Sequence, residues 1–209
     1  MTTVGRWSPN KVRARVLDGT WVSPEELGGM VLLTPTSIAY SGTSATVGAN
    51  GSVTFSACSV LSLNGVFSAD YDNYMVVIGS NNTQYNVLNG RLMSSGTPAS
   101  GTDYTIQRLR ARSTTIDGAR TTSATSFVLA TTSDVQWNGY TANIYGPFLA
   151  QPTAIRNTGV AVSSGTDTLI DDRASTHSLS NSYDGLYIFP ATAGNEMTGL
   201  VSVFGLVGA

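Results

Sequence analysis

The sequence predicts an all-β fold: an antiparallel, jelly-roll-like β-sandwich preceded by a short N-terminal anchoring segment. Lys occurs once and Glu three times in 209 residues, so the side chains that usually cover helix surfaces are scarce. Ser, Thr, Gly, Val and Tyr are abundant instead, and they favour strands joined by tight turns. Short apolar runs recur with turn residues between them, at the spacing typical of a sandwich.

Residues 1–29 differ in composition from the rest of the chain and predict an anchor. They hold four of the 11 basic residues and two of the three tryptophans. The stretch KVRARVLDGTWV alternates basic with apolar residues and then turns at Asp-Gly, which indicates a hairpin. The following SPEELGG predicts one capped helical turn ended by glycine. Because so short a segment cannot form its own core, it packs either on the main domain or on a larger assembly. The residues expected to make this contact are Trp7, Lys11, Arg13, Arg15 and Trp21.

Residues 30–209 are expected to form the β-sandwich domain. The predicted strands, in order, are TSIAY, ATVGA, GSVTFSA, VLSLNGV, NYMVVIGS, QYNVLNGRLM, DYTIQRLRAR, TSFVLA, YTANIYGPFLA, AIRNTGVAV, THSLS, GLYIFPA and TGLVSVFGLV. In FSADYDNYMVVI, two Asp, one Asn and two Tyr crowd together before an apolar run. This predicts a turn leading into a buried strand, with an ion site at Asp70 and Asp72 as the alternative. The stretch IDDRAS is interpreted as a turn.

Charge and hydropathy argue against two classes of partner. The formal net charge of −2 gives no electrostatic footprint for binding nucleic acid or an anionic membrane. The longest apolar runs, such as MVLL and YMVVI, are far shorter than the roughly 20 residues that span a bilayer. The first ten residues lack the apolar core of a secretory signal. We therefore expect no nucleic-acid binding, no membrane insertion, and synthesis in a cytoplasm.

The residues that catalysis or metal binding would need are scarce, so we expect no enzyme activity, no cofactor and no metal. Cys58 is the single cysteine, and its apolar neighbours favour an inert buried thiol. His177 is the single histidine, in a hydroxyl-rich stretch that predicts a solvated or edge position. One His and one Cys cannot form a familiar zinc site, and no GxSxG motif supplies a nucleophilic serine. Asp171 and Asp172 are adjacent, so on a strand they would face opposite ways rather than form a glycosidase pair.

Two sets of residues are candidate binding contacts. Three arginines of IQRLRAR, at positions 108, 110 and 112, share one strand face opposite Leu109 and Ala111. Arg108, Arg110 and Arg112 either form salt bridges with neighbours or recognise an acidic glycan or partner surface.

The second set is aromatic. Trp137 and Tyr140 of WNGY, and Tyr183 and Tyr187 of NSYDGLY, have the polar neighbours of exposed residues. Such rings stack on sugars, although Trp137 beside Asn-Gly is equally typical of packing at the end of a hairpin.

A family resemblance rests on the order of four stretches. LSLNGVFSADYDNYMVVI is followed by GRLMSSGTPASGTDYTIQRLRAR, then ANIYGPFLAQPTAI, then DGLYIFPATAGNEMTGLVSVFGLV. In this order, from about Val53 to Val207, they resemble a β-rich domain of structural and tail-associated proteins of tailed bacteriophages. RVLDGTWV is similar to short hairpins of minor tail proteins. The resemblance implies a virion structural protein: a tail fibre, a tail-tip protein or a receptor-binding component that contacts the host. A capsid decoration or head-fibre protein, and a free carbohydrate-binding module, are the alternatives.

The partners follow from the same considerations. Short, weakly charged strands leave sheet edges that need covering, and Lys and Glu are too few to guard them. We therefore expect a homo-oligomer, with a trimer implied by the resemblance to phage fibres. Residues 1–29 are expected to bind other virion proteins, and a host cell-surface glycan is a further possible partner. The expected location is the virion.

Overall fold

The computed structural model describes residues 29–133, 136–162 and 168–207. The predicted anchor, with Trp7, Lys11, Arg13, Arg15 and Trp21, therefore lies outside the described residues apart from Gly29. The described part contains strands and turns but no helix. Its 14 strands are β1 (Gly29–Leu33), β2 (Ser37–Val47), β3 (Val53–Asn64), β4 (Asn73–Asn82), β5 (Asn86–Ser94), β6 (Thr97–Pro98), β7 (Tyr104–Arg112), β8 (Thr115–Ala124), β9 (Phe127–Thr132), β10 (Asn138–Tyr145), β11 (Thr153–Val162), β12 (Thr168–His177), β13 (Gly185–Pro190) and β14 (Met197–Val207).

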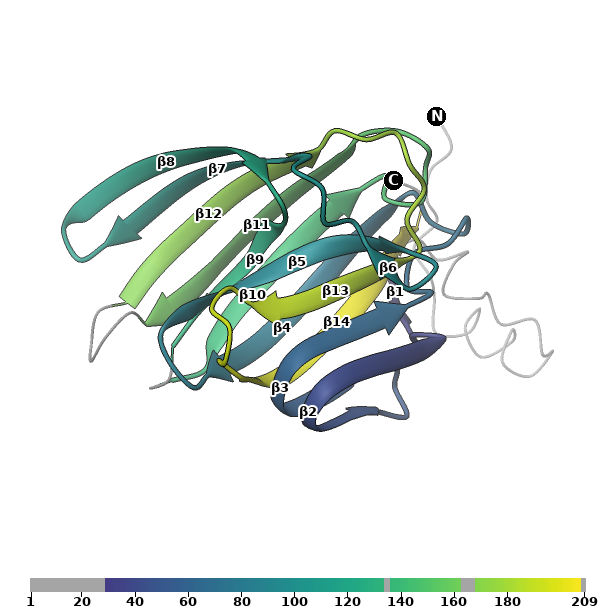
Figure 1. Ribbon diagram of the computed structural model, residues 1–209, viewed down its shortest axis with the longest axis horizontal. Helices are drawn as coiled ribbons and strands as arrows, with labels where there is room; N and C mark the ends of the chain where they lie inside the picture. The colour runs from purple at the N-terminus through teal and green to yellow at the C-terminus, as the bar shows by residue number, and fades with distance from the viewer. Residues whose placement is uncertain (1–28, 134–135, 163–167, 208–209) are drawn as a thin grey trace, which may run out of the picture.

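All of these strands pair antiparallel in one curled sheet, which confirms the predicted fold class (Figure 1). The strand order is β6-β5-β13-β3-β14-β4-β10-β11-β12-β7-β8, with β1 beside β14, β2 beside β3 and β9 beside β5. β9 also contacts the faces of β10, β11 and β12. The sheet therefore folds over itself into two layers, with β5, β9 and β13 covering the strands around β10 as in a sandwich.

One strand belongs to both layers. The first half of β3, from Val53 to Cys58, pairs with β14. Its second half, from Leu61 to Leu63, pairs with β13 of the other layer. β2 pairs along nearly the whole of β3 on its other side, and β1 takes the vacated place beside β14. The curl of the sheet is thus made within a single strand.

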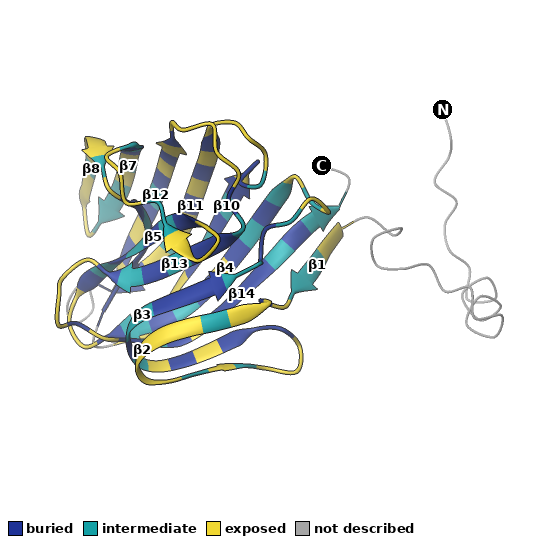
Figure 2. Cartoon of the chain, turned by 45° about the vertical axis from the view of Figure 1, so that its right-hand side comes forward, coloured by how far each residue is buried: buried dark blue, intermediate teal, exposed yellow. Residues whose placement is uncertain are grey.

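The core follows from the period-2 alternation of side chains along the strands. Figure 2 shows this alternation as buried and exposed bands along β11 and β12. The inner faces of both layers meet in one apolar cluster. It includes Tyr74, Val76 and Ile78 of β4, Leu88 and Leu92 of β5, Tyr140 and Ile144 of β10, and Leu186 and Ile188 of β13.

The motif FSADYDNY forms the turn before β4, as predicted. Tyr74 is fully buried, and its Oη accepts a hydrogen bond from Ser68 N (2.7 Å) and donates to Ser68 O (2.8 Å). Its ring packs edge-on against Phe67, with centroids 4.7 Å apart. The Tyr71 ring lies over Gly205 of β14, where a Cβ atom would come within 2.5 Å of it. The motif is therefore a folding unit that joins β4 to the last strand.

The structure differs from the sequence analysis at β12, which is predicted as a turn, and at β8, which is not predicted. IDDRAS is not a turn but the middle of β12, so Asp171 points inward and Asp172 outward. β8 was not predicted, because its side chains are exposed almost throughout and it lacks the alternation that marks a half-buried strand. It lies at the far edge of the sheet and pairs, within the described chain, with β7.

The two lone reactive residues are both buried. Cys58 is buried as predicted, and burial raises the pKa of its thiol. His177 is fully buried at the end of β12, so the prediction of a solvated or edge histidine is wrong. The reason is aromatic packing: its ring meets those of Tyr104 and Tyr183, with centroids 4.4 and 5.2 Å away. Burial lowers the pKa of His177 below its ordinary value of 6.5.

Candidate interaction site on the outer face

On the outer face of the larger layer, a line of register positions crosses seven strands and carries apolar side chains from five of them. Strand pairing aligns one outward residue from each of β14, β4, β10, β11, β12, β7 and β8. In that order the aligned residues are Leu200, Gly79, Gly139, Val160, Ile170, Ala111 and Ile116. Because neighbours in register lie side by side, they form a single line across the sheet.

The side chains of this line are unusually exposed for apolar residues. Ile116 is 75% exposed and Ile170 61% exposed, and Val160 and Leu200 are exposed as well. Trp137, 60% exposed, lies beside the line at Gly79, with its ring 3.9 Å from the Cβ position of that glycine, whereas nothing lies within 4 Å of the Cβ position of Gly139. Trp137 is thus exposed, as the sequence indicated. We call Leu200, Trp137, Val160, Ile170 and Ile116 the apolar row.

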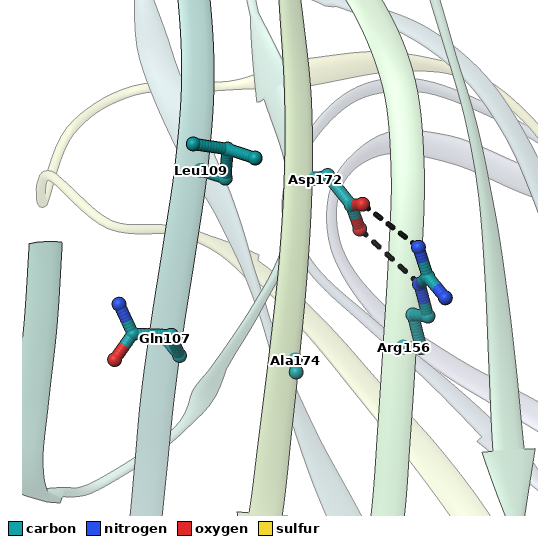
Figure 3. A pocket seen from close by; sticks show the side chains of 5 residues that line it. All are labelled: Gln107, Leu109, Arg156, Asp172 and Ala174. Atoms are coloured by element: carbon teal, nitrogen blue, oxygen red, sulfur yellow. Dashed lines mark hydrogen bonds and ion pairs between the residues drawn. The ribbon is translucent and has the colours of Figure 1, made fainter. Parts of the chain in front are cut away.

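A shallow depression of about 260 Å³ borders the apolar row (Figure 3). It is lined by Gln107 and Leu109 of β7, Arg156 of β11, and Asp172 and Ala174 of β12. Arg156 donates from Nε to Asp172 Oδ1 (3.3 Å) and from Nη2 to Oδ2 (2.9 Å). The carboxylate raises the pKa of Arg156. Because the two charges neutralise each other, the depression adds no net charge to the face.

The three arginines of β7 lie on the opposite, inner face. Arg108, Arg110 and Arg112 do share one face, with Leu109 exposed on the other, as predicted. Arg108 and Arg110 each donate to Asp117 of β8, at 3.2 and 2.7 Å. The Arg110 guanidinium, with Arg108 beside it, holds the pKa of Asp117 below its ordinary value. For Arg108 and Arg110 the salt-bridge interpretation is confirmed, and they do not form an exposed cationic stripe.

The sequence analysis does not predict the buried polar network that connects β9 with β11 and β12. Oδ2 of the fully buried Asp171 accepts hydrogen bonds from Arg173 Nε (3.0 Å), Arg173 Nη2 (2.7 Å) and Thr131 Oγ1 (2.6 Å). Asn157 Nδ2 donates to the carbonyl oxygens of Val128 (3.0 Å) and Leu129 (2.9 Å). These contacts tie β11 and β12 to β9 of the other layer. The available signal was the i, i+2 spacing of Asp171 and Arg173, which places both on one face of a strand.

Tyr140 and Tyr183, which the sequence predicts as exposed, are buried. Because they are buried, the expectation that they contact a sugar or a partner is wrong. Tyr140 packs in the core, where burial raises the pKa of its phenol. Tyr183 is also buried, and its Oη lies 3.3 Å from Nδ1 of His177. Tyr187 is half-buried on the outer side of β13.

Neither a metal site nor a known relative assigns a function to the part of the chain that the structure describes. Within the described ranges, no group of three or more His, Cys, Asp and Glu residues could hold a metal ion. The same residues contain no helix long and apolar enough to cross a membrane. No model of a known protein family and no curated protein sequence matches the chain. A functional assignment therefore depends on the surface geometry described above.

Proposed function

We propose that this chain is a structural protein of a bacteriophage virion, a tail-fibre or tail-tip subunit that assembles through its outer face. The observation that carries the proposal is the apolar row. Scattered exposed apolar residues are common, but a contiguous exposed apolar band marks a contact with another molecule. Here strand register aligns four such side chains, Leu200, Val160, Ile170 and Ile116, and Trp137 lies next to the line at Gly79. The resemblance of the four ordered stretches to tail-associated proteins gives the kind of assembly.

The face has the size of a subunit contact. Seven strands about 4.8 Å apart give the row a length of about 29 Å. With strands roughly 30 Å long, the face covers about 900 Å², close to the roughly 800 Å² that each partner buries in a standard interface. The area is therefore sufficient for a stable contact.

The partner we propose is a second copy of the same chain, in a homo-oligomer expected to be a trimer. The ion pair of Arg156 with Asp172 leaves this part of the face neutral, so it does not select a strongly charged partner. β8 at the end of the sheet contains neither Lys nor Pro, residues that commonly protect an edge strand. Packing between identical subunits covers the row and this edge together.

Light scattering tests the self-association. We expect the purified protein to be an oligomer at micromolar concentration, and Ile170→Asp to shift it to monomer by placing a charge in the row. Tyr40→Ser, at an exposed aromatic of β2 away from the row, is the matched control and should remain oligomeric. A monomeric native protein, or an Ile170→Asp variant that assembles normally, would refute the proposal.

Antibody labelling of phage particles tests the location. Label on the tail supports the tail-fibre or tail-tip assignment, whereas label on the capsid replaces it with a decoration or head-fibre protein. Particles without label contradict a virion role altogether. Removing residues 1–29 should leave the domain folded but stop its incorporation, and normal incorporation would refute the anchor.

A further inference from the structure

A second depression lies on the other layer, over β3 and β13. It has a volume of about 270 Å³. It is lined by two residues of β3, by three of β13 and by the turn 191–195. The strand residues are Ser59 and Val60 of β3, and Tyr187, Phe189 and Pro190 of β13. The two rings reach this surface because Leu186 and Ile188, which alternate with them, point into the core.

The aromatic side chains of this depression are held in place by each other and by Arg91. The rings of Tyr187 and Phe189 lie 5.3 Å apart, tilted by 48°. The guanidinium carbon of Arg91 lies 4.6 Å from the centroid of Phe189, a cation–π contact. Arg91 is itself fixed, since its Nε donates to the carbonyl oxygen of Thr125 at 2.8 Å. Phe189 is therefore held by contacts to a ring and to a cation before any ligand arrives, which lowers the entropic cost of binding.

The lining defines the chemistry of a ligand. Every residue in it is uncharged, so a charged ligand would find no opposite charge there. Two partly exposed rings offer an apolar platform. The hydroxyls of Ser59 and Thr192 lie among the lining residues and donate to Ser41 O (3.3 Å) and Asn86 Oδ1 (3.5 Å), so each offers a ligand an acceptor oxygen. Nothing lies within 4 Å of the Cβ position of Gly194, so a ligand has room to approach the turn backbone. A molecule with an apolar C–H face and a rim of hydroxyl groups fits this combination.

We propose that this depression binds a neutral pyranose unit of a glycan, with the sugar packed against Tyr187 and Phe189 and its hydroxyls bonded to Ser59, Thr192 and the turn. The volume suits a single sugar ring rather than the longer groove that an extended peptide needs. The inference deepens the proposed function, because it gives the ligand class for the host contact of a virion fibre. It requires neither the apolar row nor residues 1–29.

Saturation-transfer NMR on the purified full-length protein tests the site. The probes are the methyl glycosides of glucose, galactose, mannose and N-acetylglucosamine at millimolar concentration. We expect at least one of them to receive saturation on the C–H protons of one ring face. Tyr187→Ser should weaken that binding about tenfold by removing one stacking ring. Ala193→Trp, a change at an exposed turn position, should block the depression without touching the core.

The control is Tyr145→Ser, which removes an exposed aromatic from the outer face of the other layer and should leave sugar binding unchanged. Thermal unfolding of each variant shows whether it is folded. The inference is overturned if no probe receives saturation, if Ala193→Trp binds as well as the native protein, or if a proline-rich peptide occupies the site and the sugars do not. Because this assay uses isolated protein, its result is independent of virion labelling. Failure of the sugar site can therefore be distinguished from failure of the proposed function.

Discussion

Truncating Asp171 should destabilise the protein far more than any other single carboxylate change on β12. In Asp171→Ala, the Arg173 guanidinium and the Thr131 hydroxyl lose a shared acceptor while they remain buried between β12 and β9. Removing one partner of a buried ion pair typically costs about 3–5 kcal/mol, because the remaining charge has no compensation. Oδ2 of Asp171 accepts three hydrogen bonds here, so we expect a value in this range.

Equilibrium unfolding in urea measures the effect. With an m-value of about 3 kcal/mol/M, a loss of about 4 kcal/mol lowers the urea midpoint by more than 1 M. Asp172→Ala is the matched control, since it removes the neighbouring carboxylate, which faces solvent and pairs with a 61% exposed Arg156 side chain. An exposed pair of this kind contributes about 0–1 kcal/mol.

A double variant separates the unpaired charge from lost packing. In Asp171→Leu with Arg173→Met, no buried charge remains, and such replacements are often neutral or stabilising. We expect the double variant to recover most of the stability that Asp171→Ala loses. If Asp171→Ala and Asp172→Ala shift the midpoint equally, then β9 does not exclude water from Asp171, and the reasoning fails.

Three further outcomes are expected. Because burial lowers the pKa of His177 below 6.5, the unfolded chain binds a proton first as pH falls. Stability should therefore drop below about pH 6.5, and unfolding midpoints of His177→Gln should lose that part of the pH dependence. The Cys58 thiol, buried and with a raised pKa, should react with Ellman's reagent only after unfolding, and rapid labelling of the folded protein would contradict its burial. Gly205→Ala should cost about 1–3 kcal/mol by overpacking against the Tyr71 ring, and a stability equal to the native protein would show that the ring is free to move.

The fold class could be predicted because composition and the spacing of turn residues indicate strands and turns without knowledge of how the strands pair. The turn before β4 could be predicted as well, since Asp and Asn side chains hydrogen-bond to nearby backbone groups and so favour turns. β8 could not, because an exposed edge strand needs no apolar alternation; its hydrogen bonds to β7 are what define it. The charges of IDDRAS predict a solvent-exposed turn, whereas in the structure Asp171 and Arg173 neutralise each other in the interior.

The candidate sites could be predicted only in part. Trp137 was identified from its polar neighbours, but the rest of the apolar row depends on register between seven strands that are far apart in sequence. Tyr140 and Tyr183 have similar polar neighbours and yet are buried, because each lies on the inward side of the fold. Local sequence gives the direction of a side chain only when the strand and its neighbours are known.

The strand that both layers share has a consequence for how the protein comes apart. Since β3 hydrogen-bonds to β14 along one half and to β13 along the other, separating the layers means breaking the pairing of one continuous strand. If either layer separates from the other, β3 must lose its hydrogen bonds to β14 or to β13. The described domain should therefore unfold as a single cooperative unit. The amide hydrogens of the paired parts of β3, Val53 to Phe55 and Leu61 to Leu63, should exchange with solvent only through global unfolding.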